Sequence, residues 1–230
     1  VIETTQSGQT LKLTWDNLNR LIQSDHNGQI TSYGYDVFGR RLFKKNTTED
    51  SLTLFGWDGD LMIWESQRSN KEEENYTKHY VYEPNSFTPL FQTGYSNFIR
   101  LVETPDYKRY QTEAYSIAKD PLWKNDTRIN KAELERVAFY HCDQVGTPQC
   151  LTNERGEAVW EITLNTWGKT LNVKAFHPDN PFEHTHLRFQ GQYYDKETGL
   201  HYNRHRYYEP FSACYISKDP LGLEGGIHTS

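Results

Sequence analysis

The stretch Tyr35-Asp36-Val37-Phe38-Gly39-Arg40-Arg41-Leu42 decides the fold: an aromatic residue and an aspartate precede a short turn. Related stretches begin at Trp15-Asp16 and Trp57-Asp58, so the aromatic–aspartate pair recurs every 20 to 22 residues. A period of this length accommodates two short β-strands and two turns. The aspartate supplies an acceptor for the turn amides, and Gly39 and Gly59 permit a positive φ. The pattern predicts a β-repeat array in which these copies are scaffold.

Aromatic side chains compensate for a shortage of aliphatic ones. The 230 residues include 16 Tyr, 11 Phe and 6 Trp, whereas the hydrophobic fraction is only 35%. Alternating segments such as 30–35 and 78–82 place large rings on one face of successive strands. We therefore expect an all-β fold of antiparallel strands from about residue 8 to 218. The polar run 66–75 is expected to be a solvated hairpin tip, and the one predicted short helix lies near 127–137.

Charge and composition exclude several classes of protein. The net charge is −6 and the lysines and arginines are scattered, so we expect no nucleic-acid binding by this segment. The mean hydropathy is −0.87, and neither a membrane span nor a signal peptide is predicted. The three cysteines, at 142, 150 and 214, are expected to be buried free thiols. Because Met62 is the only methionine, we expect the chain to be a fragment of a longer polypeptide.

Two other chemical interpretations are weak. His184 and His186 have the spacing of one strand face, as in the pair at 201 and 205, but no cysteine or acid at fixed spacing completes four ligands. We therefore expect neither a metal nor a cofactor. Cys142 follows His141, and adjacent residues on a strand point to opposite faces, so a thiol nucleophile is not expected.

A carboxylate pair is the stronger catalytic hypothesis. If strands near 187–194, 200–208 and 214–218 form a meander, then Asp195 and Asp219 lie at one edge, about 10 Å apart across two strand spacings. Close carboxylates share a proton, so one can polarise a carbonyl while the other takes a proton from water. Such a pair would cleave a peptide bond of its own chain by an aspartyl mechanism. Replacing either aspartate by Asn should then abolish this cleavage and leave the fold intact.

Three features qualify this hypothesis. Glu197 lies on the same turn as Asp195 and is the alternative second carboxylate. Lys119-Asp120-Pro121-Leu122 repeats the residues around Asp219 without a following glycine, so this tetrapeptide alone carries little weight. Arg188, Arg204 and Arg206 could support the carboxylates, although arginines on tyrosine-rich strands more often form structural ion pairs or ring stacks.

Several longer motifs carry a resemblance. They are Tyr-Glu-Pro-Asn-Ser-Phe-Thr-Pro-Leu at 82–90, Tyr-His-Cys-Asp-Gln-Val-Gly-Thr-Pro at 140–148, Leu-Arg-Phe-Gln-Gly-Gln-Tyr-Tyr-Asp at 187–195 with Glu-Thr-Gly-Leu-His-Tyr-Asn-Arg at 197–204, and Asp-Pro-Leu-Gly-Leu at 219–223. Together they resemble the Rhs/YD-repeat family and its C-terminal Rhs-repeat-associated core. The sequence departs from the family pattern at Glu209, which replaces an aspartate, and at 213–215, where Ala-Cys-Tyr replaces Gly-Arg-Phe.

The resemblance implies a fold and an activity. Shells of this family are spiralling, hollow cocoons of β-strands that enclose a C-terminal toxin domain of a bacterial polymorphic toxin. They cut their own chain once, in cis, after the last residue of the Asp-Pro-x-Gly-Leu element. Transferred to this sequence, the cut falls between Leu223 and Glu224, with Asp195 and Asp219 as the aspartyl pair.

Partners, localisation and domains follow from the same resemblance. The implied partners are the rest of the shell, the enclosed toxin domain, a secretion spike protein such as that of type VI secretion, and an immunity protein. The protein would be made in the bacterial cytoplasm and then secreted or delivered to a target cell. We expect repeats over 1–102, an insertion over 103–139, the core with its autoprotease over 140–223, and the start of the released region over 224–230. The alternative function is a non-catalytic structural or adhesive surface module that binds glycans or a partner.

Overall fold

The computed structural model describes residues 2–6, 9–99, 101, 114–116 and 136–217. The chain divides into two units, one of residues 1–98 and 134–230 and the other of residues 99–133. The helix expected near 127–137 lies outside the described residues except at its end, where Arg136 and Val137 begin a strand instead.

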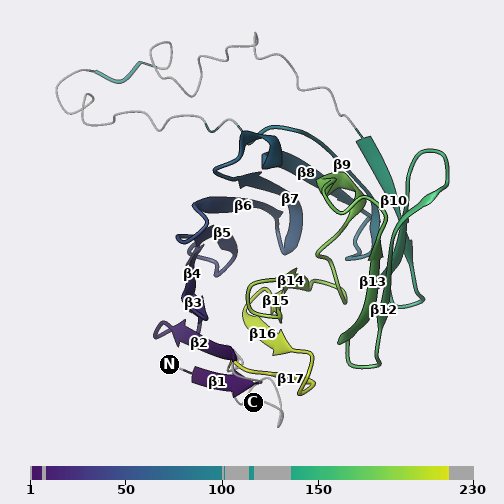
Figure 1. Ribbon diagram of the computed structural model, residues 1–230. Coiled ribbons are helices and arrows are strands. Elements are labelled where there is room, and N and C mark those ends of the chain that lie inside the picture. The colour runs from purple at the N-terminus through teal and green to yellow at the C-terminus, as the bar shows by residue number, and fades with distance from the viewer. Residues whose placement is uncertain (1, 7–8, 100, 102–113, 117–135, 218–230) are drawn as a thin grey trace. The chain divides into compact units, whose positions relative to one another are not determined.

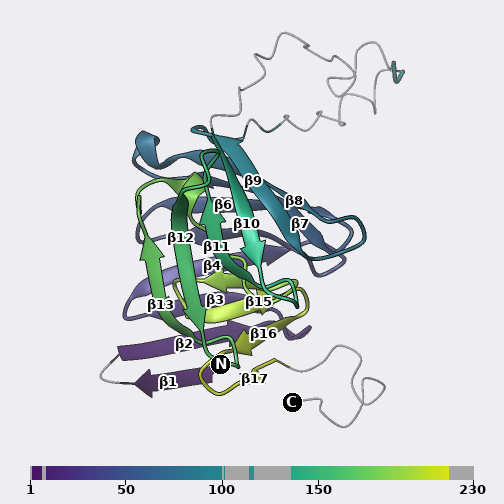
Figure 2. The ribbon, with the colours of Figure 1, turned by 90° about the vertical axis from the view of Figure 1, so that its right-hand side faces the viewer.

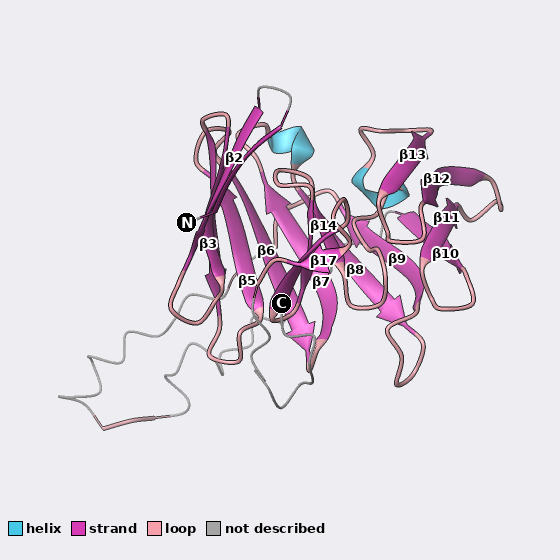
Figure 3. Cartoon of the chain, turned by 90° about the horizontal axis from the view of Figure 1, so that it is seen from below, coloured by secondary structure: helices cyan, strands magenta, loops and turns pink. Residues whose placement is uncertain are grey.

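The described residues form seventeen strands and two short 3₁₀ helices, joined by turns and loops (Figure 3). In chain order they are β1 (Ile2–Gln6), β2 (Gln9–Trp15), β3 (Leu21–His26), β4 (Gln29–Tyr35), β5 (Arg41–Asn46), β6 (Ser51–Asp58), β7 (Leu61–Arg68), η1 (Glu72–Glu74), β8 (Tyr76–Tyr82), β9 (Pro89–Tyr95), β10 (Arg136–Cys142), β11 (Pro148–Thr152), β12 (Ala158–Leu164), β13 (Thr170–Ala175), η3 (Pro181–Glu183), β14 (Tyr193–Asp195), β15 (Leu200–Asn203), β16 (Arg206–Glu209) and β17 (Cys214–Tyr215).

The strands form two antiparallel sheets. The first contains β1 to β13 in sequence order, so each strand pairs with its neighbours along the chain. The second contains β14 to β17, again in sequence order. Figures 1 and 2 show the thirteen-stranded sheet curving around the four-stranded one, which lies against its inner face. The all-β antiparallel fold is thus confirmed for the described residues, among which no helix is long and apolar enough to cross a membrane.

The repeated aspartate closes its own turn. Asp36 Oδ1 accepts hydrogen bonds from the amides of Phe38, at 2.9 Å, and Arg40, at 2.8 Å. Gly39, at the third position after the aspartate, has a φ of +76° and donates its amide to the Asp36 carbonyl. The same two side-chain bonds recur in four further turns, which begin at Asp16, Asp143, Asn153 and Asn165. The role predicted for the aspartate is therefore confirmed, and asparagine performs it equally.

This geometry predicts a graded effect of substitution at Asp36. Asp36→Ala removes the acceptor of two amides in an exposed turn and should lower the free energy of unfolding by about 1 kcal/mol. Asp36→Asn keeps the Oδ1 acceptor and should cost less, because Asn153 and Asn165 make the same turn. Urea unfolding followed by tryptophan fluorescence measures both values. Equal losses in the two variants would mean that the amides do not depend on this oxygen.

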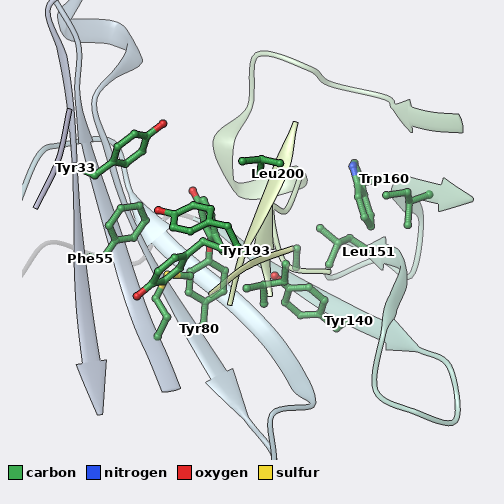
Figure 4. Packing of buried hydrophobic residues seen from close by; sticks show 14 of the residues in the cluster. Tyr33, Phe55, Tyr80, Tyr140, Leu151, Trp160, Tyr193 and Leu200 are labelled. Carbon is green, nitrogen blue, oxygen red and sulfur yellow. The ribbon is translucent and has the colours of Figure 1, made fainter. Parts of the chain in front are cut away.

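The core lies between the two sheets and is largely aromatic (Figure 4). Tyr193 of the inner sheet packs edge to face against Phe55 of β6, with ring centroids 5.3 Å apart. Tyr207 packs in the same way against Trp15, at 5.5 Å. Burial of such rings, with about 0.5–1.5 kcal/mol per well-oriented pair beyond area burial, stabilises the fold in place of the missing aliphatic side chains.

Three sequence expectations need correction. The third aromatic–aspartate copy makes a different turn, because β6 runs through Asp58, which pairs directly with Leu61. The polar run 66–75 is a hairpin tip only from residue 69, since its first residues belong to β7 and Ser66 is fully buried beside Thr77. The cysteines are free but not fully buried: Cys214 is exposed, and those at 142 and 150 are half-buried.

Candidate functional site

A buried ion pair joins the two sheets at Asp195. Arg41, the first residue of β5, donates Nη1 to Asp195 Oδ2 at 2.5 Å and Nη2 to Asp195 Oδ1 at 2.9 Å. The side chains are only 1% and 0% exposed. The Arg41 guanidinium also lies 4.3 Å from the ring centroid of Tyr202 and donates to the Tyr207 hydroxyl at 3.3 Å. Asp195, a predicted site residue, therefore fastens the inner sheet to the repeat sheet.

Glu197 lies in the same cluster and is connected to Asp195 through Lys44. The Lys44 Nζ is 3.4 Å from Asp195 Oδ1 and 3.1 Å from Glu197 Oε2. Burial raises the pKa of Asp195, an effect that Arg41 opposes and Glu197 reinforces. At Glu197 burial acts in the same direction, but Lys44, a backbone hydrogen bond and Arg41 together outweigh it, and the pKa is lowered. Two carboxyl groups of one buried cluster thus have pKa values shifted in opposite directions.

A second buried network lies on the neighbouring strands. Glu65 of β7 and Lys78 of β8 are both fully buried, with Nζ 3.4 Å from Oε1. The hydroxyl of Tyr193 donates to Glu65 Oε2 at 2.6 Å, and that of Tyr76 donates to Oε1 at 3.1 Å. Burial raises the pKa of Glu65, but Lys78 and these two hydroxyls outweigh it, so the pKa is lowered. Lys78 Nζ also donates to the carbonyl of His184 at 3.1 Å, which fixes the segment before β14.

The C-terminal meander has one more strand than expected. Asn203 pairs with Arg206 in a tight hairpin, with Arg204 at a φ of +56°, so the predicted strand 200–208 is two strands. Asp195 pairs with Leu200 at one end of this sheet. The Tyr207 amide donates a hydrogen bond to Ser217 Oγ, toward the end of the sheet formed by Asn203 and Arg206. The chain therefore leaves β17 at the end opposite Asp195, and the topological reason for placing Asp219 beside Asp195 was wrong.

The predicted supporting arginines lie in three separate environments. Arg188 is 5% exposed and lies 4.7 Å from the Tyr194 ring centroid. Arg204 forms an ion pair with Asp60 at 2.7 Å, and Arg206 lies 3.7 Å over the ring of Tyr215. None of these three lies within ion-pair distance of Asp195 in the part of the chain that the structure describes. Asp219, Leu223 and Glu224 lie outside the described residues.

The histidines take part in the same packing. His186 Nδ1 lies 3.0 Å from the Tyr193 hydroxyl, and His201 Nδ1 lies 2.8 Å from Gln192 Oε1. Burial lowers the pKa of His201 to about 3, with a contribution from the nearby charge of Arg188. Across residues 2–6, 9–99, 101, 114–116 and 136–217, no group of three or more His, Cys, Asp or Glu side chains is arranged to hold a metal ion.

Sequence reasoning missed Arg41, Lys44, Glu65 and Lys78. Arg41 belongs to the repeat motif and Lys44 follows it, and nothing in their local pattern distinguishes them from exposed charged residues. Glu65 and Lys78 could have been identified from their neighbours. Each lies on a strand that also carries aromatic residues, and a charged side chain is not expected among them.

Family comparisons match two segments of the thirteen-stranded sheet. An RHS Repeat family matches residues 15–51, and an RHS protein family matches residues 137–174, which span β10 to β13. The chain is 32% identical over 227 residues to Toxin protein Tse5 of Pseudomonas aeruginosa. The aligned region covers 95% of this chain and 16% of Tse5. It belongs to the Rhs/YD-repeat family.

Other relatives extend this picture of the Rhs chain. It is 33% identical to Double-stranded DNA deaminase toxin A of Burkholderia cenocepacia, over 96% of this chain and 14% of that protein. The structure of the Photorhabdus luminescens Tc holotoxin pore, which contains TccC3, matches with a TM-score of 0.65 at 18% identity, over 98% of this chain and 9% of that one. The Rhs chain thus spans about one sixth or less of the length of these proteins and shares the fold of the Tc shell.

Proposed function

We propose that this Rhs chain is a wall segment of a toxin shell, that its inner sheet closes the shell, and that the shell encloses a C-terminal toxin domain. The observation that carries the proposal is the buried Arg41–Asp195 pair, which joins a repeat strand to the sheet from which the C-terminal segment leaves. The names of the relatives support a toxin context, since they include Tse5 and a deaminase toxin. In this proposal, residues 1–102 build the wall and 140–223 form the core, with 103–139 as an insertion and 224–230 as the start of the enclosed region.

We further propose that the chain cuts itself once between Leu223 and Glu224. Water hydrolyses this peptide bond: its oxygen joins the Leu223 carbonyl carbon, the bond between that carbon and the Glu224 nitrogen breaks, and a proton goes to this nitrogen. Asp219 would act with a second carboxylate, either Asp195 or Glu197. Lys44 lies within 3.4 Å of both Asp195 and Glu197, so the two candidates for the second carboxylate belong to one buried cluster.

Delivery and partners remain parts of the same proposal. The shell would be made in the bacterial cytoplasm and delivered to a target cell, with a secretion spike protein and an immunity protein as partners. The structure changes one earlier expectation. Asp195→Asn would remove the partner of buried Arg41, so this variant tests stability as well as cutting.

Intact mass spectrometry of the purified chain tests the cut. The wild-type chain should yield a species that ends at Leu223, and Asp219→Asn should remain intact, because the amide cannot exchange the proton. Asp120→Asn is the matched control, since Lys119-Asp120-Pro121-Leu122 reproduces the local sequence, and it should cut like the wild type. An uncut wild-type chain with a folded circular-dichroism spectrum would instead support the structural or adhesive module.

Arg41→Gln separates the two roles of Asp195. It breaks the same ion pair but leaves the carboxyl group in place. If Asp195→Asn abolishes the cut while Arg41→Gln retains it, Asp195 takes part in the cleavage chemistry as well as in the ion pair. If both abolish it, Asp195 acts as an anchor, and Glu197→Gln shows whether the other carboxylate is required.

A further inference from the structure

The turns of the thirteen-stranded sheet lie on two opposite rims. Because each strand pairs antiparallel with the next, turns that follow even-numbered strands lie on one rim, and turns that follow odd-numbered strands lie on the other. These are termed the even rim and the odd rim. The even rim comprises residues 16–20, 36–40, 59–60, 83–88, 143–147 and 165–169, and the odd rim includes residues 27–28, 47–50, 69–75 and 153–157.

The two rims differ in polarity. Five of the six even-rim turns expose large apolar side chains, which are Leu18, Val37, Phe38, Phe87, Val145 and Trp167. Val37 is 92% exposed. The four odd-rim turns contain only polar or charged residues and glycine. Large apolar side chains that line one rim indicate a contact surface, whereas single exposed ones are ordinary.

The turn geometry does not itself require these apolar residues. In several turns, the second residue after a leading aspartate or asparagine donates its amide to the Oδ1 of that leading residue. On the even rim this second residue is Leu18, Phe38, Val145 or Trp167, and on the odd rim it is Thr48 or Arg155. The same hydrogen bond therefore forms with a polar residue, so the apolar residues of the even rim serve a contact outside the turn.

The C-terminal part of the chain binds the backbone of the even rim and leaves these side chains exposed. Three carbonyl oxygens of the rim accept a hydrogen bond at 2.8 Å from a side chain of residues 190–208: Phe38 from Arg204, Val145 from Gln190, and Trp167 from Tyr208. The side chains of Phe38, Val145 and Trp167 remain exposed all the same. Their partner must come from outside the described residues.

Further repeats of the same polypeptide have the right chemistry to cover the even rim. The regions aligned with Tse5 and with the deaminase toxin cover 16% and 14% of those proteins, so most of each relative lies outside the alignment. The RHS Repeat family matches residues 15–51, which contain the even-rim turns 16–20 and 36–40, so a further repeat presents turns of the same kind. Since β1 is the first strand of a curved sheet (Figure 1), repeats that preceded it would continue the curve and return beside one of the two rims.

We propose that the even rim is where the adjoining turn of the repeat wall packs, formed by preceding repeats of the full-length polypeptide, while the odd rim stays in water. This inference rests on the proposed function, in which the chain is one segment of a larger wall. Apolar side chains gain from burial at such a contact, whereas the charged groups of the odd rim would lose their water. The difference between the rims therefore determines on which side of this segment the wall closes.

Cysteine labelling of the full-length protein tests the assignment. Val37→Cys and Glu49→Cys place thiols in exposed turns at the two ends of β5, on the even rim and the odd rim respectively. Maleimide labelling, located by peptide mass spectrometry, should proceed at similar rates at both positions in the 1–230 chain. In the full-length protein Val37→Cys should react at least about tenfold more slowly, because a covered thiol reacts only after local opening, while Glu49→Cys keeps its rate.

The contrary outcomes are equally definite. An unchanged rate at Val37→Cys in the full-length protein, or equal slowing on both rims, would overturn the inference. Slowing that already occurs in the 1–230 chain and increases with its concentration would mean that a second copy covers the rim instead. Val145→Cys repeats the test in a distant turn of the even rim and should give the same result as Val37→Cys.

Val37→Asp supplies a second readout, because its carboxylate is solvated in the 1–230 chain and would be buried at the wall contact. The urea midpoint of the 1–230 chain should not change, and the full-length protein should become several-fold more sensitive to limited proteolysis. Asn70→Asp, on the odd rim, is the matched control and should behave like the wild type in both measurements. Unchanged proteolysis of Val37→Asp would contradict the contact. Failure of the proposed function is seen separately, as loss of the cut C-terminal piece from the full-length protein in native buffer.

Discussion

Asp195→Asn is expected to lower the free energy of unfolding by about 3–5 kcal/mol, because it leaves the Arg41 guanidinium in the core without its carboxylate. Both charged groups of the pair are almost completely buried, so water cannot replace the lost partner. Lys44 would also lose one of its two carboxylates. Urea unfolding measured by fluorescence and by far-ultraviolet circular dichroism gives the difference.

A double substitution is the control for this prediction. Arg41→Met should cost a similar amount, since it leaves Asp195 unpaired. Combining Arg41→Met with Asp195→Leu removes both charges and should recover most of the loss, because a buried ion pair contributes little relative to apolar groups of similar volume. Single losses below about 1 kcal/mol would mean that the pair does not anchor the inner sheet.

Glu65→Gln should produce a second large loss, again about 3–5 kcal/mol, by leaving Lys78 as an uncompensated buried cation. The pKa of Glu65 is lowered in the folded chain, so its contribution is present above the ordinary glutamate pKa of about 4.3. It is lost as the pH falls through the lower folded value. Unfolding measured from pH 7 to pH 3 should therefore show the wild type approaching the variant at acid pH.

Glu161→Gln provides the exposed counterpart. Glu161 and Lys174 also pair across neighbouring strands, at 3.3 Å, but their side chains are 42% and 62% exposed. The cost of breaking this pair should be under about 1 kcal/mol, since water solvates both groups. Equal effects at positions 65 and 161 would show that burial does not control the strength of these pairs.

Local features were predictable from the sequence, and long-range ones were not. The Asp36 turn needs only five consecutive residues, so its acceptor and its glycine could be predicted together. The hairpin at Asn203–Arg206 was missed because Arg204 takes a positive φ that its residue type does not suggest. Arg41, the partner of Asp195, is 154 residues away in the sequence. An alternating pattern predicts on which face of a strand a residue lies, but it does not predict which other strand packs against that face.

The sequential order of β1 to β13 has a consequence for timing during synthesis. Each strand pairs with the strand made just before it, so the wall can grow hairpin by hairpin as the polypeptide emerges from the ribosome. Asp195 and Tyr193, in contrast, need partners on β5, β6 and β7 that were made much earlier. The inner sheet is translated after the thirteen repeat strands and has a finished surface on which to dock, so translation itself sets the order in which the two sheets assemble.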